Sequence, residues 1–212
     1  MSSIEAPVVE GLDAGAVFRL LEGRRSVRRF QDRPVDVGTI RDLLQVAAWA
    51  PSPHNSQPWR FTILRPAAKA DLAAAMAARL RTDLERACVP KEEIDRQAAR
   101  SLERITGAPA AVLLSIVTQG LELTGEGEQD ALEIQMAVQS TGGVLQNLFL
   151  AAYAVGLGSC WMAAPMYCPQ EVRNTLRLPG EYRPQALVLL GYAAQPAKTK
   201  DRRRQDEIVD IR

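Results

Sequence analysis

The sequence lacks several features that would point to a specialised class of protein. Its 212 residues carry a formal net charge of only +1, with 26 Lys+Arg against 25 Asp+Glu, which argues against bulk nucleic-acid binding. No stretch approaches 18 uninterrupted apolar residues, and the first residues lack the basic-then-apolar pattern of a signal peptide. The three cysteines, Cys88, Cys160 and Cys168, have no metal-binding spacing. We therefore expect no nucleic-acid partner, no membrane partner and a reducing, cytoplasmic location.

The short motifs of several enzyme classes are also missing. HExxH, CxxC and GxSxG do not occur, so zinc hydrolysis, dithiol chemistry and serine-hydrolase chemistry have no support. The stretch GLGSCW, residues 156–161, contains G-x-G but has no third glycine, and it follows a predicted helix instead of a strand. It is therefore not a dinucleotide-binding fingerprint.

Apolar periodicity and turn residues predict an α+β fold in a single domain spanning residues 1–212. Residues 128–155 have the pattern of a central core helix, and residues 110–117 and 185–192 that of buried strands. Further helices are expected over residues 14–22, 37–50, 67–106 with a break at Val89–Pro90, and 168–176, and further strands over residues 59–64 and 158–164. The final EIVDIR is a candidate for a short edge strand. Because helices and strands mix without regular βαβ alternation, we do not expect a doubly wound sheet.

One short connection is unusually rich in polar side chains. The stretch APSPHNSQPW, residues 50–59, contains three prolines, the only histidine of the chain, an asparagine and a glutamine. A plain connector needs one turn former. The stretch is therefore either a turn with more polar residues than a turn needs or a loop that hydrogen-bonds a ligand.

Two clusters of cations lie near opposite ends of the chain. The first, RRSVRRF, residues 24–30, follows the end of a predicted helix, and the second lies in the tail KTKDRRRQDEIVDIR, residues 198–212. Arginine forks together with a serine hydroxyl suit a phosphate dianion, which accepts bidentate charge-assisted hydrogen bonds. A basic tail is otherwise often only a solvated segment. The two clusters can form one phosphate site only if the fold brings them together.

Four motifs in register resemble the flavin-dependent nitroreductase family. They are RRSVRRF, APSPHNSQPWRF, GLGSCWM and the basic tail ending in EIV, and their order and spacing agree from about Leu12 to Val209. The segment from RTDLERACVPKEE to AAVLLSIV, with GLGSCW, resembles one branch in particular, the flavin domain at the C-terminal end of the glutamyl ligase that makes the deazaflavin coenzyme F-420. Without the ligase half, the chain is expected to be a stand-alone version. The family implies a central, mostly antiparallel sheet wrapped by helices, and an intertwined homodimer with two FMN sites built from both subunits.

The resemblance also implies which residues bind FMN. The basic motif matches residues that contact the flavin phosphate, ribityl chain and pyrimidine edge, and Arg28 matches an arginine that is more often structural. The loop reaches the flavin partly from the other subunit. Main-chain N–H groups at the end of GLGSCWM and just after it face the N5 and O4 edge of the ring, and the basic tail clamps the phosphate. In chain order these residues are Arg24, Arg25, Ser26 and Arg28; Ser52, Pro53, His54, Asn55 and Gln57; Met162, Ala163 and Ala164; and Lys200 with Arg202, or Arg203 by a one-residue slip.

Some positions depart from the family pattern or leave alternatives open. Pro53 and His54 replace the small hydroxyl residues that are commonest in this loop, and a lone histidine is more often a turn residue or a packed ring than a catalytic group. Cys160 is expected in the core, since no neighbour in sequence would lower its pKa. Residues 71–104 are a candidate substrate lid, although solvated helix faces explain their arginines as well.

The resemblance implies an FMN-dependent oxidoreductase that works by ping-pong. A reduced nicotinamide or deazaflavin cofactor delivers hydride to flavin N5, and an electron-poor acceptor then takes it from the same face. The acceptor could be a nitroaromatic, a quinone, an enoyl group or a dehydro precursor of coenzyme F-420. No protein acid need take part, so no catalytic residue is expected. The alternatives are a non-redox partner of a separate ligase that holds FMN or a deazaflavin, and a flavin-destroying or dehalogenating relative.

Overall fold

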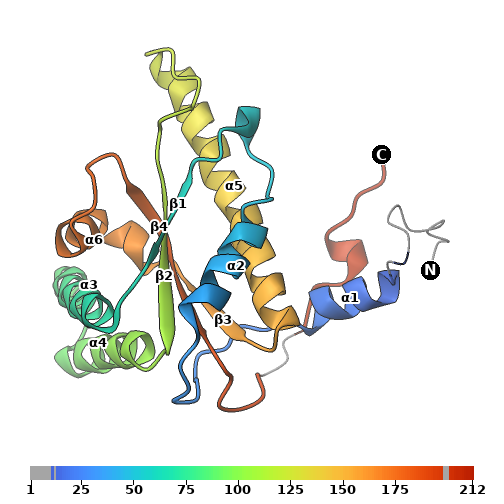
Figure 1. Ribbon diagram of the computed structural model, residues 1–212. Coiled ribbons are helices and arrows are strands. Elements are labelled where there is room, and N and C mark those ends of the chain that lie inside the picture. Colours follow the sequence, from blue (N-terminus) through green and yellow to red (C-terminus); the bar gives the residue numbers. More distant parts are fainter. Residues whose placement is uncertain (1–10, 12, 198–200) are drawn as a thin grey trace.

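One antiparallel sheet of four strands forms the centre of the molecule (Figure 1). The structure is a computed structural model that describes residues 11, 13–197 and 201–212. The strands are β1 (Trp59–Ile63), β2 (Ala110–Ile116), β3 (Gly158–Met162) and β4 (Arg183–Gly191), in the order β1-β2-β4-β3. All residues of β2 are buried, as its continuous apolar run predicts for a strand covered on both faces. The predicted α+β class is confirmed.

Helices α2 (Val37–Ala47) and α5 (Gly127–Ala154) cover one face of this sheet (Figure 1). The predicted apolar stripe of α2 is buried there, and Asp36 caps the helix by accepting a hydrogen bond from the Thr39 N–H at 2.9 Å. Helix α2 ends three residues earlier than expected. The next two N–H groups, of Trp49 and Ala50, bond to carbonyls three residues back, which tightens the last turn before Pro51.

Helices α3 (Pro66–Arg86), α4 (Lys91–Thr106) and α6 (Pro169–Leu176) cover the opposite face. On α3, Arg79 forms ion pairs of 2.9 Å with Asp83 and with Glu171 of α6, and Arg81 pairs with Asp95 of α4. These pairs join the three helices to one another. They favour a structural role for these arginines over the substrate lid that residues 71–104 suggested.

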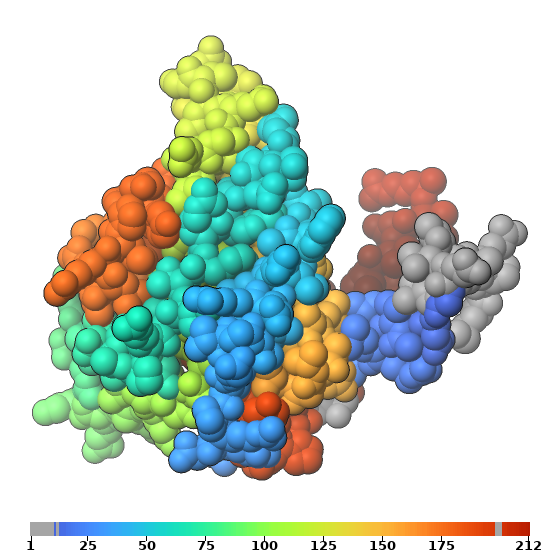
Figure 2. Space-filling view, in the orientation of Figure 1, coloured from blue at the N-terminus to red at the C-terminus, as the bar shows by residue number. Residues whose placement is uncertain are grey.

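Helix α1 (Ala14–Gly23) and the C-terminal residues extend together from one side of the molecule (Figure 2). The predicted edge strand at EIVDIR is wrong: in the described tail, residues 205–207 form a short 3-10 helix and residues 208–212 pair with no strand. The outer edge of β3 is already used by residues 26 and 27, because Ser26 bridges Ser159 and the Val27 N–H donates to the Ser159 carbonyl at 2.8 Å. Among the described residues, none of the helices combines the length and apolar character needed to span a bilayer.

Candidate functional site

The two basic clusters meet at the end of α1. Arg24 follows the last residue of this helix, and its guanidinium carbon lies 5.8 Å from the centre of the Phe149 ring on α5. Burial lowers the pKa of Arg24, and the charges of Arg25 and of Arg202 from the tail lower it further. The fold therefore places Arg202 in the field of Arg24. Arg203 is exposed, and Lys200 lies outside the described residues.

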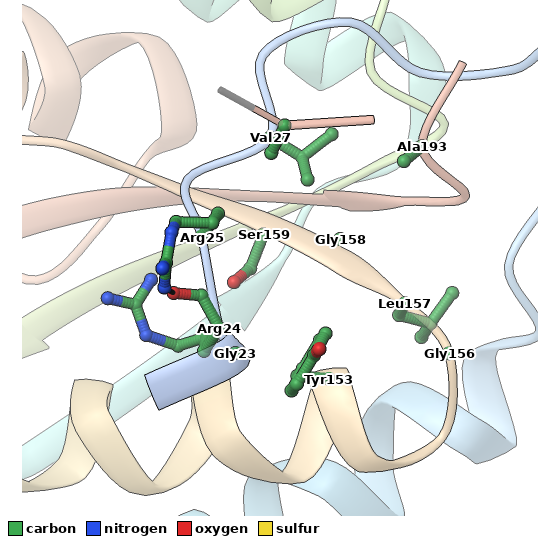
Figure 3. A pocket seen from close by; sticks show the side chains of 11 residues that line it. Gly23, Arg24, Arg25, Val27, Tyr153, Gly156, Leu157, Gly158, Ser159 and Ala193 are labelled. Carbon is green, nitrogen blue, oxygen red and sulfur yellow. Dashed lines mark hydrogen bonds between the residues drawn. The ribbon is translucent and has the colours of Figure 1, made fainter. Parts of the chain in front are cut away.

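A cavity of about 250 Å³ opens between this cluster, the end of α5 and the start of β3 (Figure 3). It is lined by Gly23, Arg24, Arg25, Val27, Tyr153, Gly156, Leu157, Gly158, Ser159, Ala193 and Ala197. No carboxylate is among these described lining residues. The Arg25 guanidinium donates to the Arg24 carbonyl at 2.8 Å, whereas the Nε atoms of Arg24 and Arg25 are buried without a hydrogen-bond partner in the described structure. Converging cations with unused donors suit an anionic ligand, and a phosphate accepts such bonds on several oxygens.

The rest of the basic motif lies beside the cavity. Ser26 is exposed and bridges β3 through its backbone, and Arg28 is also exposed. Neither lines the cavity. Val27, which the sequence did not single out, packs against Gly158: a Cβ at Gly158 would lie 2.6 Å from the Val27 Cγ2. The signal for this contact was the second glycine of GLGSCW, because only glycine allows so close an approach.

The loop 52–57 has a strained backbone. His54, Asn55 and Gln57 have φ angles of 51°, 52° and 44°, a region that non-glycine residues rarely occupy. Ser52 closes the loop, since its hydroxyl accepts from the Gln57 N–H at 3.0 Å and its carbonyl from the Asn55 N–H at 3.1 Å. Residues in such conformations cost on the order of 1–3 kcal/mol each and occur often at functional sites. A plain connector would not need them.

The loop is docked on α5 through its histidine. His54 Nε2 lies 3.5 Å from Oε1 of Glu133, and His54 Nδ1 lies 3.7 Å from Oε1 of Glu122. Glu133 is buried, and its Oε2 has no hydrogen-bond partner among the described atoms. The sequence gave no indication of this contact, because Glu133 lies 79 residues after His54.

Within one chain, the loop and the arginine cluster are far apart. The loop contacts α5 at Glu133 and the cluster contacts it at Phe149, 16 positions later, which corresponds to about 24 Å along the helix. Met162, Ala163 and Ala164 lie at the other end of β3 from the cavity, where the strand leads into a 3-10 helix. The Trp161 and Phe149 rings, 6.4 Å apart, connect this region to the cluster. Of the four predicted groups, the fold brings the basic motif and Arg202 of the tail together, places residues 162–164 at the opposite end of β3, and separates the loop 52–57 from the arginine cluster.

The cysteines differ in reactivity. Burial raises the pKa of Cys160, and burial together with the nearby Glu171 raises the pKa of Cys168 to about 11, whereas Cys88 is exposed. Because the thiolate is the reacting form, we expect one thiol to react rapidly with Ellman's reagent at pH 8 and two to react only after unfolding. A Cys88→Ser variant should lose the fast phase. A fast phase that persists in this variant would contradict the assignment.

The molecule is thus an α+β protein, with an antiparallel sheet covered by helices on both faces and a basic cavity at the edge strand β3. The chain belongs to the nitroreductase family, whose model matches residues 21–192. It is an oxidoreductase of this family. The expected family resemblance and fold are therefore confirmed.

Several relatives have named activities. The chain is 33% identical over 183 residues to the 5,6-dimethylbenzimidazole synthase of Rhodospirillum rubrum, covering 86% of this chain and 82% of that protein. It is 32% identical to an NADH dehydrogenase of Thermus thermophilus, with 88% and 91% covered. A crystal structure of a nitroreductase-like protein from Desulfovibrio desulfuricans in complex with FMN is 25% identical, has a TM-score of 0.70 and matches over 92% of this chain and 96% of that one. A BluB-like flavoprotein from Clostridium difficile, 22% identical over 95% of this chain and 99% of its own, has the same fold with a TM-score of 0.78.

Proposed function

We propose that the protein binds FMN, with the phosphate in the cavity beside Arg24 and Arg25, and that it is an FMN-dependent oxidoreductase. The observation that carries this proposal is a cavity lined by Arg24 and Arg25 and by no carboxylate among its described residues, with Arg202 close enough for its charge to lower the pKa of Arg24. Such a cluster is unfavourable by itself and is stabilised by a dianion. The FMN in the Desulfovibrio relative supports the choice of anion.

We further propose that a second copy of the chain completes the site. The loop 52–57 has the left-handed backbone typical of functional sites, yet it lies about 24 Å along α5 from the arginine cluster of its own chain. A homodimer that brings the loop of one copy to the cavity of the other would give two equivalent sites. Asn55 and Gln57 would then offer amide groups to the flavin ring, while Lys200 and Arg203 would add to the phosphate clamp.

FMN, when bound, supplies a hydride-carrying centre at N5 of its ring. The residues of the chain hold and orient it: the arginines neutralise the phosphate, and the N–H groups of residues 162–164 would face the ring edge. Donors at that edge stabilise the negative charge of the reduced ring. We propose that hydride transfer follows a ping-pong mechanism. We further propose that residues 1–212 form a single domain and that the protein is located in the cytoplasm.

The electron donor that we propose is a reduced nicotinamide. The NADH dehydrogenase name of the Thermus relative supports it. A reduced deazaflavin, with a dehydro precursor of coenzyme F-420 as acceptor, follows from the resemblance of the middle segment to the ligase flavin domain. Nitroaromatics, quinones and enoyl groups are the other acceptor classes.

The first test is the absorbance spectrum of the purified protein, followed by anaerobic addition of NADH, NADPH or reduced deazaflavin. We expect a flavin absorbance band at about 450 nm that one of the donors bleaches within seconds. A band that no donor bleaches would favour the non-redox binding role. Absence of the band even after reconstitution with FMN would overturn the cofactor assignment.

A second candidate function is synthesis of 5,6-dimethylbenzimidazole, which the 33% identity to the Rhodospirillum synthase favours. We combine it with the flavin-destroying alternative and take the bound flavin as the precursor. It makes a distinct prediction: the reduced, FMN-loaded protein, once exposed to air, would lose its flavin and release 5,6-dimethylbenzimidazole. Return of the full flavin band in air, with no such product by mass spectrometry, would exclude this reaction and support hydride transfer to another acceptor.

A further inference from the structure

The strained loop 52–57 is tied to the body of the protein by a buried carboxylate. We propose that Glu133 is a positioning residue: it holds His54 and thereby fixes the loop in the left-handed conformation that presents Asn55 and Gln57 to the flavin. The part of this inference that concerns the flavin rests on the proposed function. The part that concerns the loop does not.

The first support is the burial of Glu133. Its side chain is only 10% exposed, in the first half of α5, and Oε2 has no hydrogen-bond partner among the described atoms. A buried carboxylate is unfavourable unless a group of opposite charge or a donor faces it. His54 Nε2, at 3.5 Å from Oε1, is the group that the structure places there. An apolar residue would serve core packing better, so this carboxylate needs another explanation.

The second support is the geometry of the histidine. The two ring nitrogens of His54 face two different carboxylates, Glu133 of α5 and Glu122 of the polar segment before it. Each ring nitrogen therefore has a carboxylate oxygen within 4 Å. The backbone of His54 has φ 51° and ψ 24°, next to Asn55 at φ 52°. The ring is held within the part of the loop that has the left-handed conformation.

The third support is that the other hydrogen bonds of the loop close it on itself or tie it to the adjoining strand, where Arg60 donates to the Gln57 carbonyl at 3.3 Å. Ser52 accepts from the N–H groups of Asn55 and Gln57, and the Gln57 amide lies 3.4 Å from the Asn55 side-chain oxygen. These bonds set the shape of the loop but not its place on the helix. The contact between His54 and Glu133 attaches the loop to α5. The carboxylate therefore acts on the ligand-facing amides through the histidine.

The test compares Glu133→Gln with two matched variants. Glu122→Gln removes the exposed carboxylate, 70% accessible, on the other side of the ring, and Glu128→Gln changes an exposed carboxylate on the first turn of the same helix. Amide hydrogen exchange of residues 52–57 is measured with and without FMN, together with the FMN dissociation constant by flavin fluorescence. Because exchange of the FMN-free protein needs no cofactor, it tests the loop even if FMN does not bind.

For Glu133→Gln we expect exchange of the loop to accelerate at least tenfold and FMN binding to weaken about tenfold. Glu128→Gln should leave both unchanged, and Glu122→Gln should have a smaller effect because its carboxylate is solvated. His54→Gln, at a half-exposed position that should not impair folding, must reproduce the Glu133→Gln result, and the double variant must add nothing to it. Loop exchange at the wild-type rate in Glu133→Gln or in His54→Gln would overturn the proposal. Faster loop exchange in Glu133→Gln than in wild type, together with no FMN binding by either protein, would instead refute the proposed function.

Discussion

Replacing Arg24 by alanine should weaken FMN binding on the order of 100-fold. Arg24 is the arginine at which both basic clusters meet, it lines the cavity, and its Nε has no hydrogen-bond partner in the described structure. A charge-assisted hydrogen bond contributes roughly 1.5–3 kcal/mol, so a bidentate contact accounts for about 3 kcal/mol of binding free energy. The measurement is a fluorescence titration of FMN at fixed ionic strength, because phosphate binding is sensitive to salt.

The free energy of unfolding of the FMN-free protein separates this effect from misfolding. Arg24→Ala loses the contact with Phe149, worth about 0.5–1 kcal/mol, but relieves repulsion from Arg25 and Arg202. We therefore expect stability without FMN to stay within about 1 kcal/mol of wild type. Arg29→Ala, an exposed position in the same motif that does not line the cavity, is the control and should bind FMN normally. Unchanged affinity in Arg24→Ala would place the phosphate elsewhere.

Adding one methyl group at Gly158 should both destabilise the protein and reduce FMN binding. The new Cβ would lie 2.6 Å from Cγ2 and 2.7 Å from Cβ of Val27, closer than real carbon atoms approach. The segment that carries Arg24 and Arg25 must then move away from β3, to which it is held by the Val27 N–H bond to Ser159. Overpacking of this kind costs about 1–3 kcal/mol. Urea denaturation of the FMN-free protein measures it.

A second-site change identifies the cause of that loss. Val27→Gly combined with Gly158→Ala should recover part of the lost stability, because it removes the three Val27 atoms, Cβ, Cγ1 and Cγ2, that would lie within 3.0 Å of the new Cβ. Gly127→Ala, at the start of α5, where an added Cβ meets nothing within 4 Å, should be neutral. Equal destabilisation in the single and the double variant would show that the contact with Val27 is not the reason for glycine at this position.

Elements that depend on local pattern were predictable from the sequence. Helix α2 has a capping Asp36 and one apolar stripe, and β2 has seven apolar or small residues in succession. The tail EIVDIR has a strand-like composition too, but a strand also needs a free partner, and residues 26 and 27 already occupy the outer edge of β3. Sequence composition cannot reveal this competition for an edge.

The residues of the candidate site also fall into those that the sequence could predict and those that it could not. Arg24 and Arg25 were predicted because phosphate binding requires a particular type of side chain. Tyr153 and Val27 were not, because a cavity wall can be built from almost any residue that the fold brings there. The pair of His54 and Glu133 depends on a contact between a loop and a helix 79 residues later, so neither position reveals it alone.

The separation of the loop from the arginine cluster along α5 has a consequence for how the cofactor is retained. If each site takes its loop from a second copy, FMN affinity includes the free energy of subunit association, and the two equilibria are linked by mass action. Dilution of the protein would then release FMN, and addition of FMN would draw subunits together. Cofactor supply would set the oligomeric state of the protein, and the abundance of the chain would set how much of it carries flavin.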